Sequence, residues 1–443
     1  MLRTFALGGV HPPDTKLSAH KKIQDLPVPG EVIIPLGMHL GAPAKPVVEK
    51  GATVKVGQLI AKGDGFVTAS IHSPVSGTVA KIDKALDVTG YKRDSIYIRT
   101  EGDDWLETID RSSNVVKECS LSSVEIIQKI SDFGIVGMGG ATFPSHVKLT
   151  IPRGKKASCL IINGVECEPY LTADHALMLE KGDELIAGVT ILMKALEVKK
   201  AIIGIENNKP DAIAHLQEIV RQYDGISVQA LQVKYPQGGE KQLINAILER
   251  EVPSGGLPID VEVVVFNVGT TLAVYEAIQK NKPLFERIVT VTGKSVAKPS
   301  NFRVRLGTPV TSLIDAAGGL PDDTGKIISG GPMMGKALPG TSVPVVKGTS
   351  GILILPAKES KRKPIEPCIR CSKCVNVCPM GLEPYLLMVM AQKSLFERLE
   401  KDKVMDCIEC GSCSYTCPSS RPLLDYIRMG KSSVGKIIRS RKK

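Results

Sequence analysis

The sequence is poor in aromatic residues, has no long apolar run and contains almost no cysteine before residue 368. Phe, Trp and Tyr make up 4% of its 443 residues, and no recognition motif accompanies its net charge of +11, which argues against a nucleic-acid-binding protein. No segment reaches the roughly 18 apolar residues of a membrane span. The start, MLRTFALGGVHPPD, has one Arg and too short an apolar stretch for a secretion signal. These absences predict a folded cytoplasmic protein.

Cysteine is concentrated in two short runs near the end of the chain. Residues 368–379 read CIRCSKCVNVCP and residues 407–418 read CIECGSCSYTCP. Each is C-x2-C-x2-C-x3-C-P, the spacing with which three thiolates bind one [4Fe-4S] cubane and the fourth binds a neighbouring cubane. The crossed pattern predicts Cys368, Cys371, Cys374 and Cys417 as ligands of cluster 1, and Cys407, Cys410, Cys413 and Cys378 as ligands of cluster 2.

Two alternatives to this ligation remain open on the sequence. Each run can bind its own cluster with all four of its cysteines, although the single x3 gap makes that geometry harder. Structural zinc also uses C-x2-C pairs, but zinc ribbons usually separate two pairs by a longer loop. The segment between the runs, residues 381–403, has apolar residues at helical spacing and predicts one helix that joins two halves of a ferredoxin-like domain.

Upstream of the cysteines, short apolar runs alternate with amphipathic helical segments. Runs 159–166, 201–208, 228–234 and 261–269 predict strands, and residues 183–198, a stretch from Pro210, one near Glu240 and one after Thr270 predict helices. This alternation is typical of a doubly wound, mostly parallel sheet that binds its ligands at the carboxyl ends of the strands. The glycine-rich stretch FGIVGMGGATFPSHVKL, residues 133–149, has the composition of a phosphate-binding loop.

Four separated motifs then point to one family. GMGGATFP, NGVECEPYLTADH, YPQGGEKQL and FNVGT occur in this order before the two cysteine runs. Together with the initial GGVHPPDTK they resemble the RnfC family, a component of the Rnf electron-transport complex, over essentially the whole chain. The same motifs are similar, more distantly, to the NADH- and FMN-binding flavoprotein subunit of respiratory complex I.

The resemblance implies the cofactors and their contacts. FMN would be bound by Gly137, Gly139, Gly140, Lys148, Asn163, Glu166, Gly239, Glu240, Asn267 and Thr270, and NADH by Phe143 and Glu168. Phe143 is also compatible with a core aromatic, and Glu168 with a solvated turn. Met138, Thr142 and Lys241 depart from the complex I pattern around the nucleotide, which leaves the choice between NADH and NADPH open.

The resemblance also implies a multi-domain α/β fold. It consists of a Rossmann-like flavin domain, a barrel-sandwich β module, a small β-grasp (SLBB) module and a C-terminal α-helical domain with two clusters. The barrel-sandwich resembles biotinyl and lipoyl carrier domains, but Gly65 and Phe66 stand where such a carrier has its modified lysine. The predicted divisions are an N-terminal extension (1–28), the barrel-sandwich (29–100), the FMN/NADH domain (101–285), the SLBB module with a return segment (286–356), a linker (357–366), the ferredoxin-like domain (367–430) and a basic tail (431–443).

Electron counting completes the prediction. NADH gives up two electrons together, whereas a cluster accepts one, so a flavin must stand between them. We expect a peripheral subunit on the cytoplasmic face of the membrane that passes electrons from NADH through FMN and two clusters to a partner iron-sulfur subunit and finally ferredoxin. In the Rnf family, partner subunits couple this transfer to Na⁺ or H⁺ movement.

Two other functions remain possible on the sequence: a cobalamin reductase of the propanediol-utilisation type, and a non-catalytic iron-sulfur relay or scaffold. The basic tail is compatible with binding to anionic lipid or an acidic partner, and equally with a solvated, disordered end.

Overall fold

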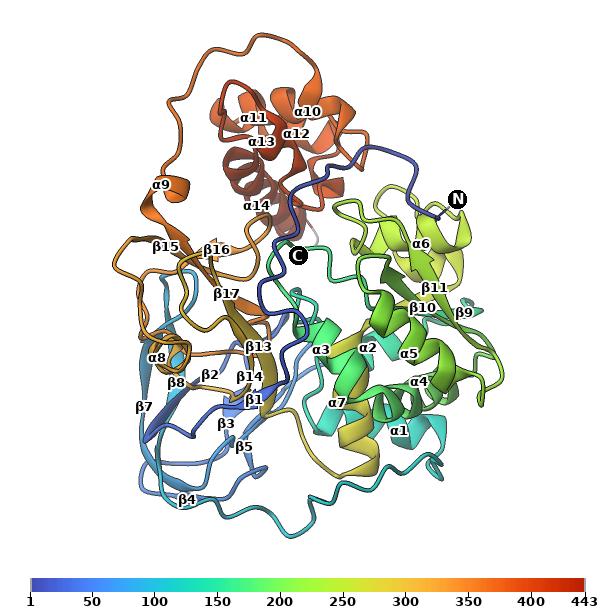
Figure 1. The fold of residues 1–443 in the computed structure, drawn as a ribbon, viewed down its shortest axis with the longest axis vertical. Helices are drawn as coiled ribbons and strands as arrows, with labels where there is room; N and C mark the ends of the chain where they lie inside the picture. Colours follow the sequence, from blue (N-terminus) through green and yellow to red (C-terminus); the bar gives the residue numbers. More distant parts are fainter. Residues whose placement is uncertain (1, 442–443) are drawn as a thin grey trace.

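The computed structural model describes residues 2–441, which form a helix-flanked parallel sheet, two β-rich modules and a C-terminal helical domain (Figure 1). Within these residues, no helix has the length and apolar composition needed to cross a bilayer. The combination agrees with the predicted fold class of an α/β flavin domain, a barrel-sandwich, a β-grasp module and a ferredoxin-like domain.

The central sheet of the flavin domain is entirely parallel. Its strand order is β11 (Ile226–Leu231), β10 (Ala201–Glu206), β9 (Cys159–Asn163) and β12 (Val263–Asn267). The connecting helices are α3 (Ala173–Glu180), α4 (Gly182–Leu196), α5 (Pro210–Val220), α6 (Glu240–Leu248) and the 3₁₀ turn η1 (Pro258–Val261), and α7 (Val268–Gln279) follows β12. All residues of β10 are buried, as expected for a strand covered on both faces.

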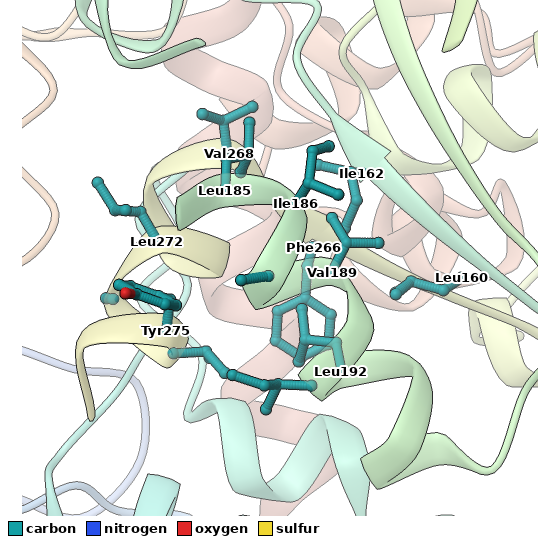
Figure 2. Close-up of a cluster of buried hydrophobic side chains, with 14 of the residues drawn as sticks. Leu160, Ile162, Leu185, Ile186, Val189, Leu192, Phe266, Val268, Leu272 and Tyr275 are labelled. Atoms are coloured by element: carbon teal, nitrogen blue, oxygen red, sulfur yellow. The ribbon is translucent and has the colours of Figure 1, made fainter. Parts of the chain in front are cut away.

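The apolar face predicted for residues 183–198 packs into the main core of this domain. Leu185, Ile186, Val189 and Leu192 of α4 meet side chains of β9, β12 and α7 (Figure 2). Burying each such side chain contributes about 1.5–3 kcal/mol, so this contact holds the helix layer on the sheet. Helices α1 (Ser123–Asp132) and α2 (Ser145–Leu149) complete the domain.

The two β-rich modules share one hydrophobic core. The barrel-sandwich contains β2 (Glu31–Pro35), β3 (Lys45–Pro46), β4 (Thr53–Val54), β5 (Leu59–Lys62), β6 (Ile71–His72), β7 (Gly77–Leu86) and β8 (Lys92–Thr100), in sheets ordered β2-β8-β7-β4 and β3-β5-β6. The second module is a six-stranded sheet with strand order β1 (Gln24–Asp25), β14 (Ser300–Arg305), β13 (Glu286–Thr292), β17 (Gly351–Pro356), β15 (Thr324–Ser329) and β16 (Lys336–Ala337), accompanied by α8 (Val310–Ala316). Val32 and Ile96 of the first module pack in one cluster with Val289 and Val304 of the second.

The C-terminal domain differs from the prediction in two ways. Helix α9 (Ala357–Ser360) lies in the predicted linker and contacts β15 and β17. The elements of the C-terminal domain are α10 (Lys373–Asn376), α11 (Pro384–Gln392), α12 (Phe396–Lys401), η2 (Val404–Asp406), α13 (Ser412–Thr416) and α14 (Leu423–Arg441). The prediction of a single helix between the cysteine runs is wrong. The segment forms two helices, α11 and α12, which are separated at Ser394, where φ is +54°. The basic segment is helical through Arg441, where α14 packs on α11 and α12, and residues 442–443 lie outside the described part.

Candidate functional site

The loops with the predicted flavin residues lie at one edge of the parallel sheet. Strands β9 and β12 pair in register, so Asn163 and Asn267, their last residues, lie side by side. The loop after β11 reaches the same edge, because the Asn163 side-chain amide donates to the carbonyl of Gly238 at 2.9 Å. Folding therefore brings together three motifs that are far apart in the sequence.

The glycine-rich loop is closed on itself and fastened to α7. Gly137 N–H donates to Phe143 O at 2.8 Å, and Met138 N–H donates to the Thr270 hydroxyl at 2.8 Å. A Cβ added to Gly139 would lie 3.4 Å from Asn267 Cβ, whereas Gly140, with φ +120°, has open space beside it. Backbone that is bare on one side gives a ligand the close approach that a phosphate or ribityl chain needs.

Helix N-termini converge at the site. The Glu166 carboxylate accepts the N–H groups of Asp174 (2.8 Å) and His175 (3.2 Å) at the start of α3. Asn267 accepts Thr270 N–H at the start of α7 and donates to the Asp174 carboxylate at 2.6 Å. Burial, together with the charge of Glu166, raises the pKa of Asp174 to about 7. Glu166 and Asn267 thus cap the two helix starts and fix the loops that follow β9 and β12 at the sheet edge.

Lys148, Glu240 and Gly239 form the opposite side of the site. Lys148 Nζ donates to Glu240 Oε1 at 2.5 Å and to Val265 O at 2.8 Å. Gly239 precedes α6, and a Cβ there would come within 2.5 Å of Gln242 Oε1. The neighbouring Gln237 is buried, and its side-chain nitrogen has no hydrogen-bond partner within residues 2–441. A lysine beside a glycine that has no room for a side chain fits a flavin phosphate.

Glu168, predicted at the nicotinamide nucleotide, contacts a loop that has no role in the sequence-based prediction. Its two carboxylate oxygens accept Met333 N–H (3.1 Å) and Met334 N–H (2.7 Å). Burial raises the pKa of Glu168 to about 7, although these amides and Lys16 favour its charged form. This loop belongs to the stretch SGGPMMGKAL, residues 329–338. The glycines of the stretch are the only sequence feature that marks the loop. Phe143 is half-buried.

The cysteines predicted for cluster 2 surround one cavity. Its lining includes Cys378 from the first run and Cys407, Cys410 and Cys413 from the second. Burial raises the pKa of Cys407 to about 11, and that of Cys410 and Cys413 as well. Within residues 2–441 no three Cys, His, Asp or Glu side chains are close enough together to bind a single metal ion. The four thiols are instead spread over the wall of the cavity. This arrangement fits the crossed set.

The cysteines predicted for cluster 1 lie nearer the surface. Cys368 and Cys371 are exposed, while Cys374 and Cys417 are half-buried. The pKa of Cys374 is raised by burial first and by the charge of Cys417 as well, so these two thiols from different runs are neighbours. The two candidate cluster sites thus differ in their access to solvent.

Tyr235 connects the flavin loops to the cluster 2 cavity. It is buried in the loop that precedes Gly238, and its hydroxyl donates to Cys410 O at 2.7 Å. Val10 and Cys410 pack beside it. This tyrosine lies within the motif YPQGGEKQL, but nothing in the sequence pattern links it to a cysteine 175 residues away.

Four known domain families match the chain in order. Residues 4–103 match the RnfC barrel sandwich hybrid domain and residues 130–276 the Nuo51 FMN-binding domain. Residues 288–337 match the SLBB domain, and residues 361–418 match the 4Fe-4S dicluster domain. FMN and two [4Fe-4S] clusters are therefore the cofactors of this chain, and its cysteine runs bind iron-sulfur clusters rather than zinc.

Relatives with these domains match the chain over nearly its whole length. It is 48% identical to the C subunit of the proton-translocating ferredoxin:NAD⁺ oxidoreductase complex of Clostridium ljungdahlii, covering 98% of this chain and 94% of the relative. It is 44% identical to the C subunit of the Na⁺-translocating ferredoxin:NAD⁺ oxidoreductase complex of Acetobacterium woodii, covering 96% of each.

A solved NAD⁺-reducing [NiFe]-hydrogenase has a similar fold, with a TM-score of 0.51 at 18% identity, covering 71% of this chain and 63% of that one. The relatives, the order of the domains and the geometry of the sites lead to the same conclusion. The chain belongs to the RnfC family of ion-translocating ferredoxin:NAD⁺ oxidoreductases, and it is an electron-transfer subunit of such a complex.

Proposed function

We propose that this chain takes electrons from NADH at the FMN site, passes them first to cluster 2 and then to cluster 1, and delivers them to a partner subunit. The hydrogen bond between Tyr235 and Cys410 carries the proposal, because it joins the flavin loop directly to the wall of the cluster 2 cavity. Bound FMN supplies the conversion between a two-electron donor and one-electron acceptors. The glycine loop and Lys148 would hold it, with Glu166 and Asn267 fixing the neighbouring loops.

The exposure of the cluster 1 cysteines supports cluster 1 as the site from which electrons leave the chain. Cys368 and Cys371 are exposed, and the neighbouring apolar residues Ile365 (63% exposed) and Ile369 (68% exposed) are unusually accessible. Arg370 and Lys373 are exposed in the same segment. Exposed apolar residues among basic ones are typical of a docking surface for an acidic protein. We assign this surface to a partner iron-sulfur subunit, which passes electrons on toward ferredoxin.

The ion-translocating steps belong to partner subunits in this proposal, and the chain is placed peripherally on the cytoplasmic face of the membrane. Two relatives carry names with different ions, H⁺ and Na⁺, so the coupling ion is not assigned. NADH is placed beside Phe143 and Glu168.

Two cysteine variants test the order of the clusters. In the anaerobically reconstituted full chain, Cys371→Ser should impair cluster 1 while NADH still reduces cluster 2, as seen by EPR of rapidly frozen samples. Cys413→Ser should impair cluster 2 and leave cluster 1 oxidised by NADH but reducible by dithionite. If NADH reduces cluster 1 at the wild-type rate in Cys413→Ser, the order is reversed or the path does not pass through cluster 2.

A further inference from the structure

The N-terminal extension runs between the ferredoxin-like domain and the flavin domain (Figure 1). We call residues 3–16 the N-terminal strap. Val10 pairs with Tyr235 through two backbone hydrogen bonds of 2.8 and 2.9 Å, and Gly9 N–H donates to Val377 O at 3.0 Å. The strap therefore bonds to a flavin loop and to a cysteine run within two consecutive residues.

Glycine is required where the strap meets the cysteine run. Gly8 and Gly9 have φ values of +69° and +95°, which favour glycine. A Cβ on Gly8 would lie 2.7 Å from the backbone of both Val377 and Cys378. This backbone contact fixes Cys378, one wall of the cluster 2 cavity, against the strap. Tyr235, on the other side of the strap, contacts Cys410 of the same cavity.

Lys16, at the other end of the strap, supports the loop that carries Glu166 and Glu168. Its ammonium group donates to the carbonyls of Glu166 (2.8 Å), Glu168 (3.0 Å) and Leu171 (2.6 Å), which uses all three of its donors. Glu166 and Tyr170 adopt positive φ values of +47° and +72°, which non-glycine residues keep only when their surroundings hold them there. Tyr170 N–H also donates to Asp14 O of the strap at 2.7 Å.

From these contacts we propose that the strap positions the two redox sites: Gly8 and Gly9 hold the cluster 2 cavity against the Tyr235 loop, and Lys16 holds the flavin and nucleotide loop. Lys16 is a positioning residue, because it acts on backbone carbonyls. A general structural tie would anchor anywhere on the surface. Between Gly8 and Lys16, the backbone and ammonium anchors instead fall on Val377, Tyr235 and the loop that carries Glu166 and Glu168. The side chains of His11 and Asp14 add contacts to Val233 O and to Asn208.

Gly8→Ala tests the cluster end of the strap. The added methyl must displace backbone at Val377 and Cys378, which moves one wall of the cluster 2 cavity. We expect NADH to reduce the flavin at the wild-type rate, flavin reoxidation by the clusters to slow severalfold, and the EPR spectrum of dithionite-reduced cluster 2 to change. Gly30→Ala is the matched control, because Gly30 has no left-handed φ and open space at its Cβ position.

Lys16→Met tests the flavin end. We expect the KM for NADH and the Kd for FMN to rise by about tenfold, because the loop loses the hydrogen bonds of one charged donor. The EPR spectrum of cluster 2 should stay unchanged. Lys21→Met is the matched control, because Lys21 belongs to the same N-terminal region but donates to Pro299 O, away from the flavin loop.

The inference rests on the proposed electron path, and the two fail differently. If NADH reduces neither cofactor in the wild-type chain, the proposed function fails. If the wild type is active and Gly8→Ala and Lys16→Met behave like their controls, or each impairs both half-reactions equally, the positioning role is overturned. Should Gly8→Ala not fold, Tyr235→Phe probes the same junction by removing one hydroxyl, and a wild-type EPR spectrum and reoxidation rate there would also overturn it.

Discussion

Replacing Lys148 with Met tests whether the residues at the sheet edge hold FMN. The change removes the hydrogen bonds of Lys148 Nζ to Glu240 and Val265 O and leaves the Glu240 carboxylate unpaired beside an anionic cofactor. It also removes the charged hydrogen bond that Lys148 would give the FMN phosphate, and such a bond contributes about 1.5–3 kcal/mol. The two side chains are 32% and 39% exposed, so solvent screening favours the lower end of that range.

A loss of about 1.5 kcal/mol corresponds to roughly tenfold weaker FMN binding. Titration of flavin-free protein with FMN, followed by fluorescence quenching, measures the affinity, and iron and sulfide analysis of the same samples reports the clusters. Lys45→Met is the control, because the Lys45–Asp64 pair (2.7 Å) is largely exposed and lies in the barrel-sandwich. Unchanged FMN affinity, or a parallel loss of iron, would refute the assignment of Lys148 to the flavin site.

Three further outcomes follow from individual contacts. Because the pKa of Glu168 is raised to about 7, the KM for NADH should change around pH 7, and Glu168→Gln should flatten that pH profile; an unchanged profile would place Glu168 outside the nucleotide site. Tyr235→Phe leaves the Cys410 carbonyl without its donor and should cost about 1–3 kcal/mol, visible as a lower anaerobic unfolding temperature. Burial lowers the pKa of Lys347 to about 7 from 10.5; the unfolded chain therefore binds more protons between these values, and stability should rise with pH across this window by up to about 5 kcal/mol. Denaturant midpoints at pH 7 and pH 9 check this, and Lys347→Met should remove the rise.

Local patterns in the sequence were enough to predict the parallel sheet and both cysteine runs. Alternation of buried strands with amphipathic helices is a short-range signal, and the face of α4 with Leu185 and Val189 packs as its spacing indicated. The fixed spacing within each cysteine run likewise needs no knowledge of the rest of the chain.

Long-range contacts were not predictable from these patterns. Lys16 lies 150 residues from Glu166, and no periodicity relates a lysine to three backbone carbonyls. The same holds for Glu168 and the amides of Met333 and Met334. The break at Ser394 between α11 and α12 was missed because the segment contains neither glycine nor proline at the break, and the apolar spacing continues across it.

The central claim is that one polypeptide carries electrons from NADH through FMN to both clusters. An anaerobic NADH titration of the reconstituted full chain, with flavin absorbance and cluster EPR followed together, tests it most directly. The account predicts that the flavin absorbance bleaches and that reduced-cluster signals then appear, that of cluster 2 before that of cluster 1. If NADH changes neither signal in flavin-loaded protein while dithionite reduces the clusters, the proposed path is contradicted.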